Sequence, residues 1–266
     1  LGADYLLFKE IRLGLRLRIG NARTPAPSYD GVQHVQYLQH IPHINKKVMT
    51  QWIIFDMDWL LIDSEPIWRA AGRETLQYYG VDPDAYVVDS SKIQWQKHED
   101  VVKMQIQQYR LDPDIAEQMA DLKVSKVIEK MTQQLMFLPG AQTVLKEIRN
   151  LWAPVWLASG SPYRVIDHAI QIMDMWNYFD AVYSADEVSI GKPNPSIFLG
   201  AAQRLGVAPQ KCIVFEDATN GVIAAKAAQM KVITVPSSFQ KWNPILEIAD
   251  VRLKSLEEFE LSHLDL

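Results

Sequence analysis

A short apolar run that ends in two closely spaced aspartates constrains the fold of this chain more than any other feature. Residues 52–55 are continuously apolar, which favours a strand buried on both faces, as in the interior of a parallel sheet. Asp56 and Asp58 follow directly, and the alternation of an extended chain places both carboxylates on one side. Ligands of open α/β sheets bind where strands end, so the two side chains are placed for metal binding or covalent chemistry. An isolated pair of this kind would suit a solvated acidic turn better.

A second apolar run, residues 155–158, leads into Ser159-Gly160-Ser161-Pro162. We expect a strand followed by a helix, with Ser161 as the N-cap and Pro162 as the first helical residue. A hydroxyl and free amides between a strand and a helix suit phosphate binding. On the pattern alone, an ordinary capped helix is an equally good interpretation.

A third strand is expected at residues 181–184, and Lys192 follows it between a glycine and a proline. A lysine in that setting cannot lie within a regular helix or strand, so a defined loop presents its side chain. The alternative is a solvated lysine at a turn. Asn194 is expected to cap a helix that runs through residue 205.

A fourth strand, residues 213–215, leads directly into Glu216 and Asp217. Adjacent carboxylates at a strand end repel each other unless a cation or a ligand compensates their charge. A last strand is expected at residues 232–235. Strands that alternate with helices in this way predict an α/β fold with a parallel sheet.

The four polar clusters, in this order, resemble the four motifs of the haloacid dehalogenase superfamily. Residues 55–66 resemble the first motif, and their Asp63-Ser64-Glu65-Pro66 is typical of small sugar-phosphate phosphatases, the group of 2-deoxyglucose-6-phosphate phosphatase and hexitol phosphatase B. The resemblance covers residues 50–255. It implies a Rossmann-like, doubly wound parallel sheet with an inserted small α-helical cap domain.

The resemblance also implies a catalytic role for each of the motifs. Asp56 is the implied nucleophile, which takes the phosphoryl group as an aspartyl-phosphate, and Asp58 is the implied general acid and base. Ser159 and the Gly160 amide are implied to hold the transferring group. Lys192 is implied to bridge the nucleophile and the phosphate. The second aspartate favours phosphoryl transfer over dehalogenation.

The implied cofactor is Mg²⁺, a cation that prefers oxygen ligands. Its expected ligands are the Asp56 carboxylate, the main-chain carbonyl of Asp58, and the carboxylates of Asp217 and Glu216. The substrate is expected to be a small sugar phosphate, such as 2-deoxyglucose 6-phosphate or a hexose 6-phosphate, with Glu65 among the residues that bind it.

Trp59 departs from the superfamily pattern, which usually has a small residue, most often glycine, after the second aspartate. We expect the indole to stack on the substrate or to line the cap interface. The alternative is that its bulk blocks the site and leaves a phosphate-binding protein. A second alternative is a sugar phosphomutase of the β-phosphoglucomutase type, although Trp68 stands where those mutases carry a histidine.

The expected domains are a core of residues 49–65 and 139–266 and a cap of residues 66–138. Apolar spacing predicts cap helices at about residues 66–80, 99–109 and 115–135. His98 lacks the second histidine of a zinc-protease helix and is expected at the surface. Residues 1–48 show no clear period and are expected to be disordered or not native, for example upstream sequence translated from a wrongly assigned start.

The charge is distributed unevenly along the chain. The net charge is −5, but residues 1–48 hold seven basic and three acidic residues, which leaves the remainder strongly acidic. An acidic body argues against nucleic acid as a partner. No apolar run approaches the roughly 20 residues that span a bilayer, so no membrane partner is expected either. The single cysteine, Cys212, suits a reducing compartment and a cytoplasmic protein, and we expect a monomer.

Overall fold

The computed structural model describes residues 51–82, 97–151, 153–237 and 243–264. The predictions made for residues 1–48 lie outside these ranges. All the predicted strands and the candidate catalytic residues lie inside them.

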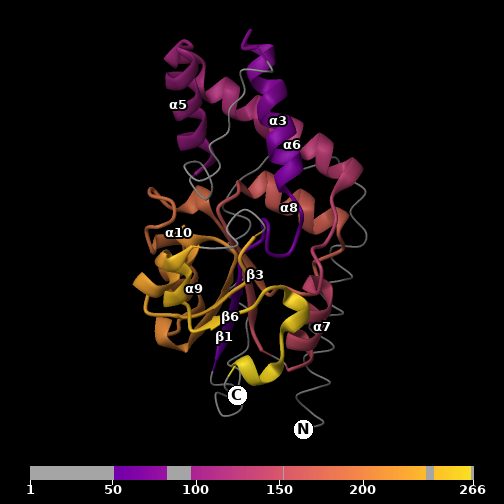
Figure 1. The fold of residues 1–266 in the computed structure, drawn as a ribbon, viewed down its shortest axis with the longest axis vertical. Coiled ribbons are helices and arrows are strands. Elements are labelled where there is room, and N and C mark those ends of the chain that lie inside the picture. The colour runs from indigo at the N-terminus through magenta and orange to yellow at the C-terminus, as the bar shows by residue number, and fades with distance from the viewer. Residues whose placement is uncertain (1–50, 83–96, 152, 238–242, 265–266) are drawn as a thin grey trace. The chain divides into compact units, whose positions relative to one another are not determined.

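A parallel sheet forms the centre of the described chain, with the strand order β3-β2-β1-β4-β5-β6 (Figure 1). Its strands are β1 Trp52–Phe55, β2 Val155–Ser159, β3 Ala181–Ser184, β4 Cys212–Glu216, β5 Lys231–Thr234 and β6 Val251–Arg252. Every residue of β2 and β4 is buried, as expected for strands covered on both faces. Along the chain, β2 and β3 are added on one side of β1, and β4, β5 and β6 are then added on its other side. The order in which strands are added therefore reverses between β1 and β4, while all the strands stay parallel.

Helices cover both faces of the sheet. Figure 1 shows α9 (Ser196–Leu205) and α10 (Thr219–Ala227) on one side, and α7 (Ala141–Asn150) and α8 (Tyr163–Ile172) on the other. Apolar residues of α7 and α8 join Ile53, Phe55 and other strand residues in one hydrophobic cluster. The predicted doubly wound α/β fold is therefore confirmed.

Three more helices lie in the chain between β1 and α7. They are α3 Glu65–Tyr78, α5 His98–Tyr109 and α6 Ala116–Gln134, close to the predicted bounds. A small hydrophobic cluster of their own joins them: Leu76, Val102, Ile106 and Met119. Figure 1 shows the three helices together at one end of the sheet. That residues 66–138 act as a separate cap domain stays a prediction.

The expectation that His98 lies at the surface is wrong. The side chain is 7% exposed, and its Nε2 lies 3.0 Å from the carbonyl oxygen of Ala120 on α6. Because α5 packs against α6, the side of α5 on which His98 lies is covered. The missing zinc motif was evidence about metal binding and said nothing about burial.

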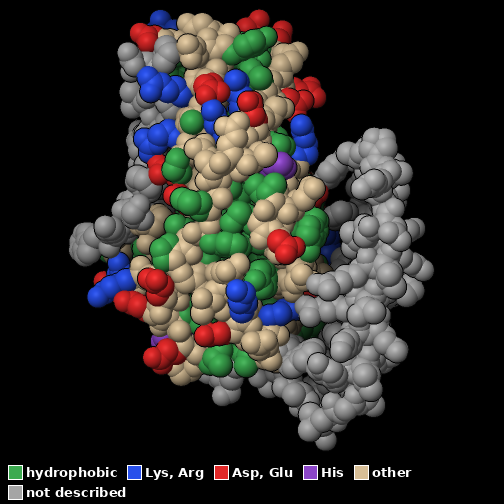
Figure 2. All heavy atoms as spheres, turned by 90° about the vertical axis from the view of Figure 1, so that its right-hand side faces the viewer, with side chains coloured by type: hydrophobic (Ala, Val, Ile, Leu, Met, Phe, Trp, Pro, Cys, Tyr) green, Lys and Arg blue, Asp and Glu red, His purple; other side chains and the backbone are tan. Residues whose placement is uncertain are grey.

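The remaining regular elements are short 3₁₀ helices: η3 Pro113–Ile115, η4 Ala185–Glu187, η5 Pro209–Lys211, η7 Pro244–Ile248, η8 Leu256–Glu258 and η9 Leu261–Leu264. Within the described residues, none of the helices combines the length and apolar character needed to cross a membrane. On the face shown in Figure 2, acidic and basic side chains are interspersed and neither sign forms a continuous patch. A concentrated group of charges lies instead in the interior, at the strand ends.

Candidate active site

The carboxyl ends of β1 and β4 lie side by side, at the point where the strand order of the sheet reverses. Phe55 is paired with Phe215, and the Asp56 amide donates to the carbonyl oxygen of Phe215 at 3.0 Å. This register brings Asp56 beside Glu216, the last residue of β4. Ligand sites of open α/β sheets form at such a reversal point. The sheet therefore places the first and the fourth sequence motif together.

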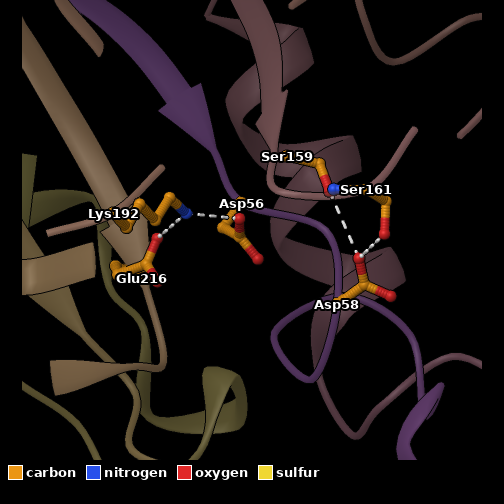
Figure 3. Close-up of polar contacts among 6 residues, drawn as sticks. All are labelled: Asp56, Asp58, Ser159, Ser161, Lys192 and Glu216. Atoms are coloured by element: carbon orange, nitrogen blue, oxygen red, sulfur yellow. Dashed lines mark hydrogen bonds and ion pairs between the residues drawn. The ribbon is translucent and has the colours of Figure 1, made fainter. Parts of the chain in front are cut away.

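Three buried carboxylates gather here around one lysine. Oxygens of Asp56, Glu216 and Asp217 lie within 4.8 Å of one another. Lys192 Nζ donates to Asp56 Oδ1 at 2.7 Å and to Glu216 Oε2 at 3.0 Å (Figure 3). The side chains come from three separate chain segments, so the fold, and not sequence proximity, assembles the group.

Burial dominates the electrostatics of this group. It raises the pKa of Asp56 against the opposing charge of Lys192, and it raises the pKa of Glu216 to about 8. For Asp217, burial and the neighbouring carboxylates raise the pKa well above its ordinary value. Burial alone would lower the pKa of Lys192, but Asp56 and Glu216 more than reverse that effect. One lysine therefore cannot hold all three carboxylates in their charged form.

The donor set fits a divalent cation. Glu216 Oε1 and both carboxylate oxygens of Asp217 are buried and have no hydrogen-bond partner among the described residues. Buried carboxylates without partners are costly, and a hard cation with oxygen ligands satisfies and neutralises them together. The predicted ligands Asp56, Glu216 and Asp217 are thus brought together in a geometry suited to a metal.

Asp58 lies on the other side of the site, where four donors hold its carboxylate. Ser64 Oγ donates to Oδ1 at 2.6 Å, and Trp68 Nε1 donates to the same oxygen at 3.3 Å. Ser159 Oγ at 3.2 Å and Ser161 Oγ at 2.7 Å donate to Oδ2 (Figure 3). The Asp58 side chain is therefore held by the β2 loop on one oxygen and by the start of α3 on the other.

Sequence reasoning missed three of these four donors. Ser161 was expected to cap α8, but Pro162 is the N-cap residue and Ser161 donates to Asp58 instead. A hydroxyl just before a helix looks the same in either role. Ser64 and Trp68 are four residues apart at the start of α3, a spacing that places them on one helix face and was a usable signal.

Trp59 adopts a left-handed backbone with φ of 62°. Bulky residues rarely occupy this region, which glycine enters without strain. The amide of Trp59 donates to the carbonyl oxygen of Ile62 at 2.9 Å, which closes the tight turn after β1. The backbone here thus has the conformation for which the superfamily's usual glycine is suited.

The two other predicted substrate residues have different surroundings. Glu65 forms an ion pair with Arg69 one turn along α3. At Gly160, a Cβ atom would meet no described heavy atom within 4 Å, so the space on that side of the glycine is open. Open space at a glycine suits the close approach of a ligand such as phosphate to the main chain. A substrate role for Glu65 stays a prediction.

Known proteins resemble this chain in sequence and fold. The family model of haloacid dehalogenase-like hydrolases matches residues 53–235. Hexitol phosphatase B of Escherichia coli K12 is 32% identical over 212 residues, which cover 77% of this chain and 92% of that protein. The fructose-1-phosphate phosphatase YqaB of the same organism is 34% identical over 188 residues, 69% of this chain and 95% of its own.

A solved structure shows the same fold. The crystal structure of CbbY from Rhodobacter sphaeroides in complex with phosphate matches with a TM-score of 0.73 at 23% identity, over 82% of this chain and all of that one. The sequence and family matches confirm the predicted superfamily and the predicted class of enzyme: this chain belongs to the haloacid dehalogenase-like hydrolases.

Proposed function

We propose that this chain is a Mg²⁺-dependent phosphatase that hydrolyses small sugar phosphates through a phosphorylated Asp56. The observation that carries the proposal is the buried group of Asp56, Lys192, Glu216 and Asp217, with Asp58 held separately by four donors. Such an arrangement offers a nucleophile, charge neutralisation and a proton carrier within one site.

Asp56, Glu216 and Asp217, with the main-chain carbonyl of Asp58, are the proposed ligands of Mg²⁺. The ion would neutralise charge on the phosphate and favour the ionised form of the buried carboxylates. Lys192 contributes positive charge at the same place, because it contacts both Asp56 and Glu216.

Asp56 is the proposed nucleophile. Its carboxylate oxygen forms a bond to phosphorus while the bond from phosphorus to the sugar oxygen breaks. Lys192 Nζ and Ser159 Oγ, with the Gly160 amide, share the charge on the phosphoryl oxygens. Water then attacks the phosphorus, which releases phosphate and restores the Asp56 carboxylate.

Asp58 is the proposed acid and base in both halves of this sequence. It gives a proton to the departing sugar oxygen and then takes one from the attacking water. The hydroxyls of Ser64, Ser159 and Ser161 can rotate to accept as well as donate, so they can serve the protonated and the ionised carboxyl.

The proposed substrate class rests on the named relatives. Hexitol phosphatase B and fructose-1-phosphate phosphatase both act on phosphorylated carbohydrates by name, and the chain spans more than nine tenths of each. We propose that residues 66–138 cover the site and select among such esters.

The proposed location is the cytoplasm. The thiol of Cys212 is buried, and burial raises its pKa to about 12, so the thiol is inert and suits that location.

A phosphomutase is the weaker proposal. The residue twelve positions after Asp56 is Trp68, whose indole N–H donates to Asp58. An indole N–H can donate a hydrogen bond, but the ring cannot accept a proton from one group and pass it to another. The side chain therefore cannot replace a histidine in proton transfer.

The test is phosphate release from a panel of sugar phosphates with and without Mg²⁺. We expect metal-dependent turnover that Asp56→Asn abolishes. A sugar 1-phosphate assayed with and without its bisphosphate tests the mutase. Isomerisation that requires the bisphosphate would replace the phosphatase proposal, and a folded protein without any turnover would favour a site blocked by Trp59.

A further inference from the structure

A buried lysine on α6 has no negative partner among the described residues, although a buried lysine ordinarily has one. Lys123 is 4% exposed, yet it forms no ion pair with any carboxylate of the described residues. Lys192, equally buried, contacts two carboxylates, and Lys126 and Lys130 on α6 both pair with Glu74. Burial lowers the pKa of Lys123 to about 8, which shows how little its surroundings compensate the charge.

The neighbours of Lys123 are an aromatic ring and a neutral imidazole. Its Nζ lies 5.7 Å from the centroid of the Trp68 ring, and the rings of Trp68 and His98 are 5.5 Å apart. Burial, and then the charge of Lys123, lower the pKa of His98 to about 3, so this imidazole is neutral near pH 7. Among the described residues, the attractive interaction of the ammonium is its cation–π contact with Trp68.

Trp68 connects this lysine with the proposed chemistry. The indole N–H donates to Asp58 Oδ1 at 3.3 Å, while the ring faces Lys123. If Asp58 protonates the departing sugar oxygen, its neighbour Trp68 lies on the side of the leaving group. The proposed partners of the phosphoryl group are Lys192 and Ser159, which lie with Asp56 and Asp58 at the strand ends (Figure 3). Lys123 is therefore not needed to bind the phosphoryl group.

We propose that Lys123 determines specificity by donating hydrogen bonds to oxygens of the leaving group, so that the site favours polyhydroxylated esters over esters without hydroxyls. This inference rests on the proposed function and specifies the substrate class of the same site. An ammonium has three N–H donors and no acceptor, so sugar hydroxyl and ring oxygens are suitable partners. The substrate would supply the partners that the described residues do not.

The test measures binding, so it does not depend on turnover. The Asp56→Asn protein with Mg²⁺ is titrated calorimetrically with 2-deoxyglucose 6-phosphate and with phenyl phosphate, which lacks hydroxyls. The same titrations are made after adding Lys123→Met or, as a matched control, Lys103→Met. Lys103 is an exposed lysine on α5, outside the proposed site. Lys123→Gln, which keeps a donor, is the second variant.

We expect Lys123→Met to weaken binding of the sugar phosphate at least about tenfold and binding of phenyl phosphate less than about twofold. Lys123→Gln should lie between, and Lys103→Met should change neither. The melting temperature of Lys123→Met should not fall, because the change removes an uncompensated buried charge.

Equal losses for both esters, or no loss for either, would overturn the inference. A lower melting temperature with weaker binding of both esters would assign Lys123 a structural role instead. Lys123-dependent binding without phosphate release by the unmodified chain would refute the proposed phosphatase but not this contact. If the unmodified chain bound neither ester, both proposals would fall.

Discussion

At the scale of single residues, Trp59 in the turn after β1 combines a bulky side chain with a backbone conformation that favours glycine. Trp59 occupies a left-handed conformation that costs a non-glycine residue about 1–2 kcal/mol. The indole is only half-buried, so packing offsets part of that cost. The turn sets the direction in which the chain leaves Asp58, and strain here bears directly on the site.

Trp59→Gly should raise turnover or broaden the range of sugar phosphates accepted. Relief of about 1 kcal/mol corresponds to at most about a fivefold gain in kcat/KM. The measurement is steady-state kinetics on the substrate panel. Trp176→Gly is the control, since Trp176 is exposed and its φ is not positive. Unchanged kinetics in Trp59→Gly would show that the residue has no influence on the reaction.

His98 is a second residue whose environment makes a measurable prediction. Its pKa lies at about 3 in the folded protein and near its ordinary value of 6.5 in the unfolded chain. Between these values the unfolded chain binds one more proton, so the folded state loses stability as pH falls. At most about 1.4 kcal/mol per pH unit is involved.

His98→Gln keeps an N–H donor for the Ala120 carbonyl and removes the titration. Between pH 7 and pH 5, the free energy of unfolding should fall by up to about 2 kcal/mol less in the variant than in the parent. Urea unfolding at both pH values measures this. Equal losses in both proteins would mean that His98 titrates with the same pKa in the folded and the unfolded state.

At the scale of elements, the packing of α10 against β4 depends on Gly221. A Cβ at this position would lie 1.9 Å from Glu216 Oε1, and Glu216 is fully buried. Because the Glu216 carboxylate is buried, moving it would cost free energy. Gly221, which has no side chain, therefore leaves room for Glu216, a proposed metal ligand.

Gly221→Ala should destabilise the protein by about 1–3 kcal/mol, the usual range for overpacking. In a Glu216→Ala background the same change should be neutral or stabilising, because alanine favours helix over glycine by about 1 kcal/mol. Unfolding of the four proteins in the cycle isolates this coupling. Equal effects of Gly221→Ala in both backgrounds would mean that Gly221 does not make room for Glu216.

The elements also show what the sequence could predict. The strands β1 to β5 were predictable because each is an apolar run that ends in polar residues. β6 was not, because two residues, one of them exposed, show no period. The four motifs located the charged group, but Ser161 and the Trp68 contact depend on where α8 begins and how α3 leaves the sheet. The buried state of Lys123 depends on tertiary packing that its local sequence does not encode.

At the scale of the whole molecule, the helices between β1 and α7 share packing with the sheet. Ile67 on α3 and Val127 on α6 belong to the same hydrophobic cluster as the strands. Lys97, just before α5, donates to the carbonyl oxygen of Val188 at 2.7 Å, in the loop that precedes Lys192. Contacts between the proposed cap and the core therefore reach a loop that contributes to the site.

Mg²⁺ should stabilise the folded protein, because the unfolded chain lacks the assembled ligands. At a hundred times its dissociation constant, the ion should add about 2.7 kcal/mol. Asp217→Asn should remove this gain and raise the melting temperature of the metal-free protein, since it relieves repulsion among buried carboxylates. Thermal unfolding with Mg²⁺ and with a chelator tests both statements. An unchanged response to Mg²⁺ in the variant would contradict the proposed ligand set.

The most direct test of the whole account is to find the phosphoryl group on the protein. The unmodified protein is mixed with Mg²⁺ and 2-deoxyglucose 6-phosphate, quenched in acid within milliseconds, and digested for peptide mass spectrometry. We predict a phosphorylated peptide that contains Asp56 and that is absent from the Asp56→Asn protein. Phosphate release by the unmodified protein with no phosphorylated Asp56 at any time, or with the phosphoryl group on another residue, would contradict the account.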